Sequence, residues 1–138
     1  MIFRGLFGGT SKPPEGRDLG KRGEDEAARV LKKNGYKVIE RNFRCRRGEI
    51  DLIATDGETI VFVEVKARGR GSIGSPEEAV DSRKRDRIIK AAREYLMRSG
   101  QSDRQVRFDV VSVEPGDGKD GKKSFRTEII KDAFQTVR

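Results

Sequence analysis

The stretch Gly48-Glu49-Ile50-Asp51-Leu52-Ile53, followed by Val61-Phe62-Val63-Glu64-Val65-Lys66, decides how this chain folds. Branched apolar residues dominate both stretches, which is typical of buried β-strands. Both also carry ionisable residues, and a buried charge is costly unless it is paired or holds a metal ion. Asp51, Glu64 and Lys66 are therefore the first candidates for chemistry.

A tight turn at Asp56-Gly57 is expected to join the two strands. Pairing would then start with Thr55 opposite Glu58. In that register Asp51 and Glu64 are diagonal neighbours on one face, roughly 7 Å apart at the backbone. Two carboxylates so close repel each other unless a cation lies between them. We therefore expect Mg²⁺ or Mn²⁺ there, because both ions prefer oxygen ligands.

An Asp on one strand and Glu-x-Lys on the next is the arrangement that metal-dependent nucleases use to cut phosphodiesters. The bound ion would activate water and polarise the phosphate. Lys66 would orient that water or stabilise the charge on the phosphate. The alternative is an ion pair on a solvated strand face, and the neighbouring valines argue against it.

Glu24 is a further candidate ligand, on a helix expected over residues 19–34. It shares a helix face with Ala27, Ala28 and Leu31, and such a face packs on a sheet. A glutamate there can reach a metal ion, or it can simply stabilise the positive end of the helix dipole. The residues alone leave both interpretations open.

Composition restricts the chemistry. The chain has 138 residues, no histidine and one cysteine, which excludes serine–histidine triads, histidine-ligated zinc and disulfides. A net charge of +8 favours a polyanionic partner such as nucleic acid. No apolar run approaches the roughly 20 residues of a membrane span, so we expect a cytoplasmic protein with no membrane partner. The side chains expected to contact phosphates are Arg44, Arg46, Arg47, Arg68, Arg70 and Lys84, although an exposed helical lysine is a common alternative for the last.

Residues 1–17 are expected to form a flexible tail and residues 18–138 a single domain. The predicted order αβββαββ indicates an α/β or α+β fold with one mixed sheet of about five strands flanked by helices. Ser75 is the expected N-cap of the second helix. The remaining predicted elements are strands over 36–43, 107–113 and 125–130, a helix over 75–99, and a helical turn near 133–134.

Several motifs in fixed order resemble the YraN-type family of small bacterial proteins, across roughly residues 19–134. The residues that carry the resemblance are Gly20-Lys21-Arg22-Gly23-Glu24, Ala27-Ala28, Asn42, 48–53, 62–66, Gly74, Pro76, Ala79-Val80, Lys84 and Arg107-Phe108-Asp109-Val110. That family is similar to the restriction-endonuclease-like fold and to archaeal Holliday-junction resolvases. The resemblance implies that Glu24, Asp51 and Glu64 bind metal and that Lys66 is catalytic.

The resemblance also implies a nuclease for structured or branched DNA, with DNA favoured over RNA. Because resolvases cut as dimers, it raises a homodimer as an expectation. One alternative is a non-catalytic nucleic-acid-binding or adaptor protein of the same fold. Another is an interaction module whose basic face meets an acidic protein.

Overall fold

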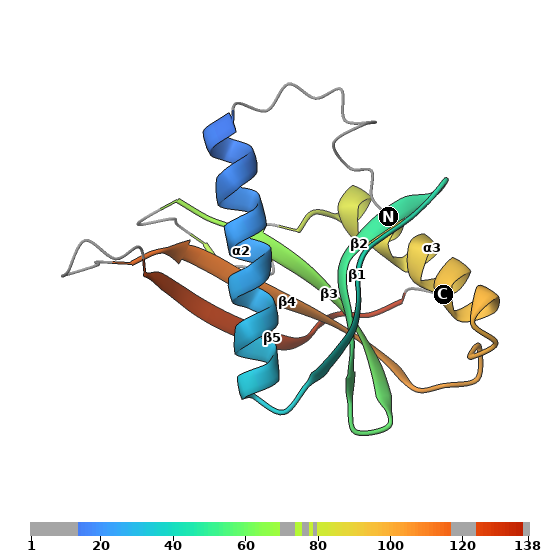
Figure 1. Cartoon of the computed structure of the whole chain (residues 1–138). Helices are drawn as coiled ribbons and strands as arrows, with labels where there is room; N and C mark the ends of the chain where they lie inside the picture. The colour runs from blue at the N-terminus through green and yellow to red at the C-terminus, as the bar shows by residue number, and fades with distance from the viewer. Residues whose placement is uncertain (1–13, 70–73, 76–77, 79, 117–123, 137–138) are drawn as a thin grey trace.

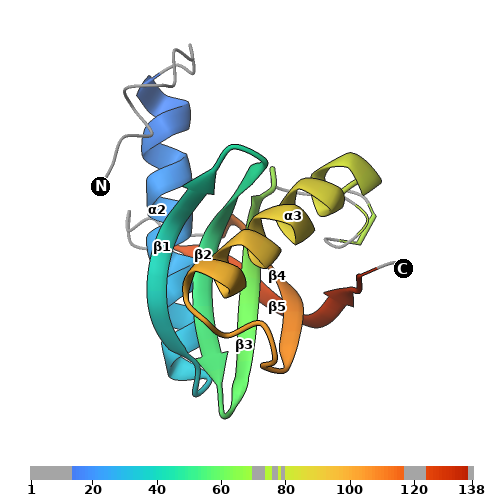
Figure 2. The same ribbon diagram turned by 90° about the vertical axis from the view of Figure 1, so that its right-hand side faces the viewer.

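The structure, a computed structural model, describes residues 14–69, 74–75, 78, 80–116 and 124–136. In that part of the chain a five-stranded sheet carries one helix on each face (Figures 1 and 2). The elements are α2 (Pro14–Lys33), β1 (Lys37–Cys45), β2 (Gly48–Asp56), β3 (Thr59–Ala67), α3 (Ser82–Arg98), β4 (Val106–Pro115) and β5 (Phe125–Phe134). The predicted α+β class and the order αβββαββ are confirmed. Neither described helix is long and apolar enough to cross a membrane.

The strands lie in the order β1-β2-β3-β4-β5, with β3 and β4 parallel and every other neighbouring pair antiparallel. A parallel pair needs a long crossover, which α3 provides between β3 and β4. The two parallel strands lie in the interior of the sheet and are largely buried on both faces, as expected for a parallel pair. β5 lies at one edge of the sheet.

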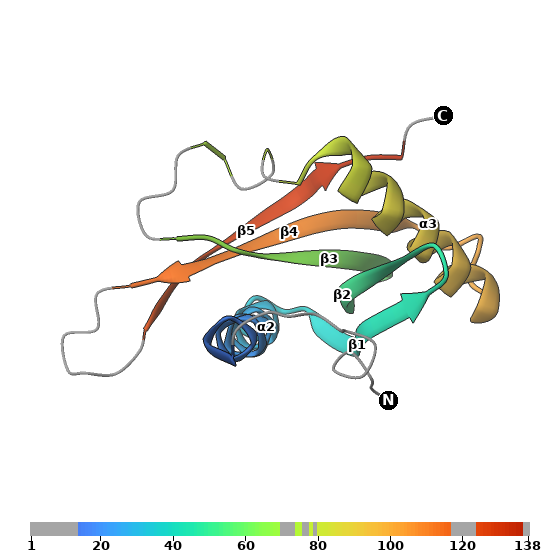
Figure 3. The ribbon, with the colours of Figure 1, turned by 90° about the horizontal axis from the view of Figure 1, so that it is seen from above.

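Alternating side chains along β3 supply both layers of the core. α2 and α3 lie on opposite faces of the sheet (Figure 3). Val61 and Val63 belong to the cluster under α2, whereas Ile60 and Phe62 belong to the cluster under α3. Phe62 is fully buried, and its ring meets the edge of Tyr95 from α3 with centroids 5.9 Å apart. Burial of one such side chain stabilises the fold by roughly 1.5–3 kcal/mol.

The turn between β2 and β3 corrects the predicted register. Asp56 pairs with Thr59, so Gly57 and Glu58 form the turn, with Gly57 at a φ of 61° that favours glycine. The predicted pairing of Thr55 with Glu58 is therefore wrong by two residues. Because side chains alternate with a period of two, an error of two residues still leaves Asp51 and Glu64 beside each other.

The second helix begins later than predicted. Asp81 is its N-cap, and the Asp81 carboxylate accepts a hydrogen bond of 2.9 Å from the amide of Lys84. Ser75, the predicted cap, instead accepts from the amide of Glu78 through its hydroxyl, at 3.4 Å. Aspartate and serine are similar N-caps in general, so the sequence pattern did not distinguish the two starts.

Two other boundaries differ from the prediction. α2 begins at Pro14, within the segment expected to be a tail. β5 continues to Phe134, so the helical turn predicted near 133–134 is wrong. Phe134 pairs with Phe108 of β4, and the two rings stack with centroids 5.1 Å apart. This contact holds the end of β5 against the sheet.

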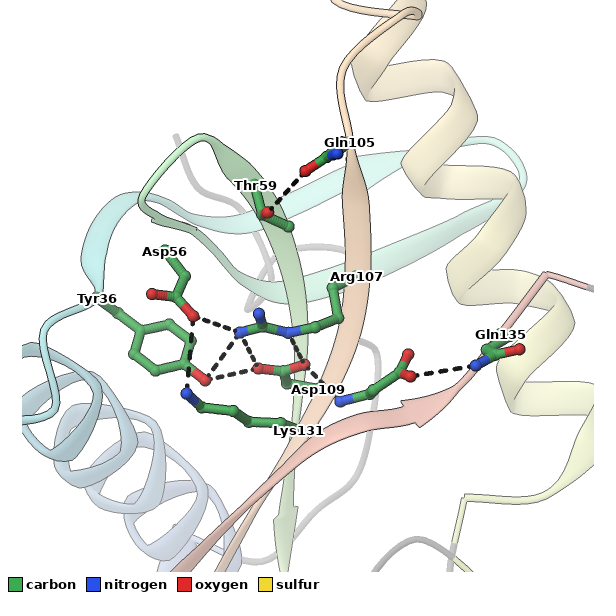
Figure 4. A network of polar contacts seen from close by, with 9 residues as sticks. Tyr36, Asp56, Thr59, Gln105, Arg107, Asp109, Lys131 and Gln135 are labelled. Carbon is green, nitrogen blue, oxygen red and sulfur yellow. Dashed lines mark hydrogen bonds and ion pairs between the residues drawn. The ribbon is translucent and has the colours of Figure 1, made fainter.

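A buried polar network joins β4 and β5 to the residue that precedes β1 (Figure 4). The fully buried carboxylate of Asp109 accepts from Arg107 at 2.9 Å and from the hydroxyl of Tyr36 at 2.8 Å. It also accepts from the backbone amide of Asp132 at 2.9 Å. Arg107 donates in addition to Asp56 at the end of β2. Burial and the Asp109 carboxylate raise the pKa of the Tyr36 phenol, so it remains a hydrogen-bond donor.

Replacing Asp109 with Ala should lower the free energy of unfolding by about 3–5 kcal/mol, because the buried partners of the carboxylate lose their acceptor. Urea unfolding measures the loss. The matched control is Asp25→Ala, which breaks a 2.7 Å ion pair with Arg41 whose side chains are 51% and 39% exposed. That variant should lose no more than about 1 kcal/mol. Equal losses in both variants would contradict a special role for the buried network.

Candidate functional site

β2 turns away from β3 beyond their last paired residues (Figures 1 and 3), and we call this place the fork; Asp51 and Glu64 directly follow the last pair. The paired residues of these strands end at Leu52 opposite Val63. Just beyond, the backbone amide of Val65 donates to Oδ2 of Asp51 at 2.8 Å. The carboxylate thus takes the place of a backbone acceptor where the ladder opens, and this bond fixes its position.

Glu64 points to the opposite face from its neighbours. Val63 and Val65 pack under α2, so the Glu64 side chain faces α3. There Nζ of Lys84 lies 3.3 Å from Oε2 of Glu64. The Glu64 side chain is only 7% exposed, whereas that of Lys84 is 41% exposed. The structure therefore places Lys84, a predicted phosphate contact, on a carboxylate.

Burial is the main cause that raises the pKa of Glu64, to about 8, and the adjacent Asp51 adds to the shift. Lys84 acts in the other direction and lowers the Glu64 pKa. The Asp51 carboxylate therefore lies close enough to Glu64 to disfavour the ionised form of Glu64. The fork therefore holds two carboxylates that repel each other when both are ionised.

In the buried Asp109 network the carboxylates have different charged neighbours. Its two carboxylates, Asp56 and Asp109, face two cations, Arg107 and Lys131. The charges in that network balance, so it needs no additional ion. At the fork, Nζ of Lys84 lies against the buried carboxylate of Glu64, which has the buried carboxylate of Asp51 beside it. A cation placed between Asp51 and Glu64 would relieve the repulsion between these two carboxylates.

The donor set at the fork fits a hard divalent cation, because Mg²⁺ is commonly held by one or two carboxylates with water as its other ligands. In the described part of the chain, no third Asp, Glu, His or Cys completes a metal-binding group with the pair. α2, which carries Glu24, packs on the face of the sheet opposite α3. The structure therefore brings together Asp51 and Glu64, while metal binding by Glu24 stays a prediction.

Lys66 follows Glu64 by two residues on β3 and so lies on the same face, roughly 7 Å further along the strand. It is partly exposed and lies opposite Ser112 of β4. None of the described residues forms an ion pair with the Lys66 ammonium within 4 Å. It can therefore meet a ligand beside the fork without first breaking an ion pair to a described residue.

The other predicted phosphate contacts lie in different surroundings. Arg44 is paired with Glu49 at 3.0 Å. The guanidinium of Arg68 donates to the carbonyl of Gly74 at 2.9 Å. Arg70 lies outside the described residues. Arg44 and Arg68 would therefore bind a phosphate only by sharing or exchanging these partners.

Arg46 and Arg47 form the exposed turn between β1 and β2. The next residue, Gly48, lets this hairpin lie directly against α3. A Cβ at this position would lie 3.0 Å from the carbonyl carbon of Arg87 and would clash with its oxygen. The hairpin tip and the start of α3 thus present one basic surface beside the fork. We call it the arginine ridge; its members are Arg46, Arg47, Arg83 and Arg87, all exposed and without an ion pair to a described residue.

The sequence analysis missed Arg83 and Arg87. Both lie on the solvent side of α3, one turn apart, where arginines are typical of an ordinary solvated helix. Only the contact at Gly48 shows that this part of the helix lies beside the hairpin and the fork. A glycine at the start of a core strand was the available signal, because it often marks close backbone approach.

A cavity of about 590 Å³ lies elsewhere, between α3 and the end of β5. The guanidinium of Arg85 stacks over Phe134 there, 5.3 Å from the ring centroid, and donates to the carbonyl of Val80. Neither acid of the fork lines this cavity. The buried acids, not the cavity, therefore define the candidate site.

Comparison with known proteins finds relatives that match this chain over most of their own length. Residues 23–113 match the model of the uncharacterised protein family UPF0102. A UPF0102 protein of Desulforapulum autotrophicum is 48% identical over 118 residues, which cover 86% of this chain and 93% of the relative. One from Geobacter metallireducens is 52% identical over 97 residues, covering 70% and 80%. One from Symbiobacterium thermophilum is 48% identical over 118 residues, covering 86% and 97%. These matches confirm the resemblance that the sequence motifs indicated.

Replacing Gly48 with Ala should lower the free energy of unfolding by about 1–3 kcal/mol, because the new methyl group overpacks the contact with Arg87. Urea unfolding measures this. The control is Gly23→Ala in α2, where a Cβ would meet Val113 at 3.9 Å, an ordinary contact. That helical substitution should be neutral or stabilise by up to about 1 kcal/mol. If Gly48→Ala is equally well tolerated, the hairpin does not rest tightly on α3.

The stability of the protein should fall as pH rises from about 5 to 8, and Glu64→Gln should remove part of this dependence. The folded chain binds a proton at Glu64 with a pKa of about 8, whereas the pKa of a free glutamate is 4.5. Stability from this proton is complete below the lower value and is lost as pH rises through the upper one, by at most about 1.4 kcal/mol per pH unit.

Urea unfolding of wild type and E64Q across this pH range tests the expectation. The stability of E64Q relative to wild type should increase with pH. Glu58→Gln, at the exposed β2–β3 turn, is the control and should follow the wild-type curve in shape. A constant difference between E64Q and wild type would show that Glu64 does not bind this proton.

Proposed function

The chain belongs to the uncharacterised protein family UPF0102, and we propose that it is a Mg²⁺- or Mn²⁺-dependent nuclease that hydrolyses phosphodiester bonds in structured or branched DNA. The observation that supports this most directly is the buried pair of Asp51 and Glu64 at the fork. Two desolvated carboxylates that lie against each other offer the oxygen ligands that a divalent cation prefers, and such a cation would relieve their repulsion.

Each residue of the fork has a separate part in this proposal. The Val65 amide fixes the Asp51 carboxylate, so one ligand is oriented before any ion binds. Glu64 supplies the second ligand from the α3 face of the sheet. When bound, the cation would polarise the phosphate and lower the pKa of a coordinated water.

Lys66 extends the site along β3 on the face of Glu64. During hydrolysis a water oxygen bonds to phosphorus, the bond between phosphorus and the leaving sugar oxygen breaks, and that oxygen takes up a proton. Negative charge grows on the phosphate oxygens during this exchange. An ammonium group beside them stabilises the transition state more than the ground state, which is the requirement for catalysis.

The arginine ridge supports a nucleic-acid substrate. Its four guanidinium groups lie beside the fork and can bind backbone phosphates without breaking an ion pair to a described residue. Arg44, Arg68, Arg70 and Lys84 remain predicted contacts that would join them. Phosphate contacts make binding salt-dependent, with a slope of roughly 0.9 per phosphate for duplex DNA. The choice of DNA over RNA rests on the family resemblance.

One observation favours the second candidate, a non-catalytic nucleic-acid-binding or adaptor protein. The ion pair of Lys84 with Glu64 already neutralises one carboxylate in the protein alone. A chain that keeps this pair permanently would retain the acids for stability and use the basic surface for binding. The two functions differ in one outcome, which is whether any nucleic acid is cut.

The test is a panel of four-way junction, flap, duplex and single-stranded DNA and matching RNA, incubated with Mg²⁺, Mn²⁺ or chelator. Wild type should cut at least one branched DNA only with a divalent ion. Asp51→Asn should reduce cutting at least about 100-fold, while DNA binding stays within a factor of about two. Asparagine can still accept the hydrogen bond from Val65, so the fold should persist.

The matched control is Asp103→Asn, which makes the same chemical change at an exposed residue just before β4. It should cut like wild type. Symmetric paired nicks in a junction would support action as a homodimer. Binding without cutting of every substrate would favour the non-catalytic alternative, and equal cutting by D51N would end the proposed mechanism.

A further inference from the structure

We propose that Lys84 is the resident counter-cation of the fork and competes with the divalent ion for Glu64, so that metal binding releases the Lys84 side chain to the substrate. This inference rests on the proposed metal site. It assigns Lys84 a role in regulating access to the site, beyond a simple phosphate contact. The argument depends on one ion pair, on unequal burial, and on the position of α3.

The two partners of the ion pair differ in their freedom to move. Glu64 is 7% exposed on an interior strand, whereas Lys84 is 41% exposed near the start of α3. The Lys84 ammonium can therefore withdraw into water, but the Glu64 carboxylate cannot. Any exchange of partners at Glu64 must then proceed by movement of Lys84.

The backbone of Lys84 is held while its side chain is free to turn. The Lys84 amide donates to the N-cap Asp81 at 2.9 Å, which anchors the first turn of the helix. Nζ of Lys84 lies 3.3 Å from Oε2 of Glu64. A cation bound to the carboxylates of Asp51 and Glu64 would meet this ammonium at close range, and like charges at that distance repel strongly. The ion and the ammonium therefore exclude each other.

Once released from Glu64, the Lys84 ammonium lies close to the arginine ridge, which includes two residues of the same helix. Lys84 lies directly after Arg83 and three residues before Arg87, both members of the arginine ridge. A phosphate bound at the ridge can take up the Lys84 ammonium once it leaves Glu64. By linkage, a phosphate that draws Lys84 away would also favour metal binding at Glu64. The ion pair would thus keep the acids neutralised until metal and substrate arrive.

The test measures Mn²⁺ binding to the whole chain by electron paramagnetic resonance, at pH 8 and without nucleic acid. Lys84→Met keeps the length of the side chain and removes its charge. K84M should bind Mn²⁺ about tenfold more tightly than wild type. The matched control is Lys90→Met on the same helix, which breaks the exposed pair with Asp86 and should bind Mn²⁺ like wild type.

Thermal unfolding gives a second readout. Without metal, K84M should have a lower Tm than wild type, because two buried acids lose their counter-cation. Saturating Mn²⁺ should raise the Tm of K84M more than that of wild type, in line with its tighter binding. A purely structural lysine would produce the first change without the second.

The outcomes separate the two proposals. If wild type binds Mn²⁺ and K84M binds it equally or more weakly, the competition is disproved while the metal site stands. If neither protein binds Mn²⁺, the metal site fails and the competition fails with it. Tighter binding by K84M but not K90M is the result that supports the inference.

Discussion

Two carboxylates that lie together in a largely buried position are the central feature of the candidate site. Asp51 and Glu64 lie together where β2 leaves β3, and desolvation and their mutual proximity raise the pKa of Glu64 to about 8. The amide of Val65 holds one acid, and the ammonium of Lys84 lies on the other. The Val65 amide belongs to β3 and the Lys84 ammonium to α3. The hydrogen bond and the ion pair with the two acids therefore help to hold α3 and the diverging end of β2 in position.

The opposite face of the sheet shows how the same fold buries an acid within a network of cations and hydrogen-bond donors. There the Asp109 carboxylate is surrounded by the Arg107 guanidinium, the Tyr36 hydroxyl and a backbone amide of β5. Every donor and acceptor has a partner, and the described residues contain no buried polar side-chain atom without one. This network can serve stability alone. The close approach of two carboxylates, Asp51 and Glu64, distinguishes the candidate site from this network.

The contact at Gly48 affects both the packing of the hairpin and the shape of the proposed substrate surface. The glycine lets the hairpin touch the backbone of α3 at Arg87, and this contact joins arginines from two distant parts of the chain into one surface. The same helix delivers Lys84 to the fork. A change at this contact would therefore move the basic surface and the acids together, which couples the proposed substrate surface to the proposed metal site.

Local patterns in the sequence determined the element order, the mixed sheet and the faces of Asp51 and Glu64. These features follow from the alternation of side chains along strands, which survived even though the β2–β3 register was predicted two residues off. Each of these depends on residues close in sequence or on strand periodicity.

Only the tertiary structure decided which distant side chains meet. The pairing of Lys84 with Glu64 depends on how α3 crosses the sheet. The face of the sheet on which α2 packs, opposite to α3, was likewise decided by tertiary packing. β5 extends through Phe134 because that ring stacks on β4, a contact that no local pattern contains. Sequence periodicity specifies the face on which a side chain lies, but long-range packing selects its partner, and the partner sets its charge and its chemistry.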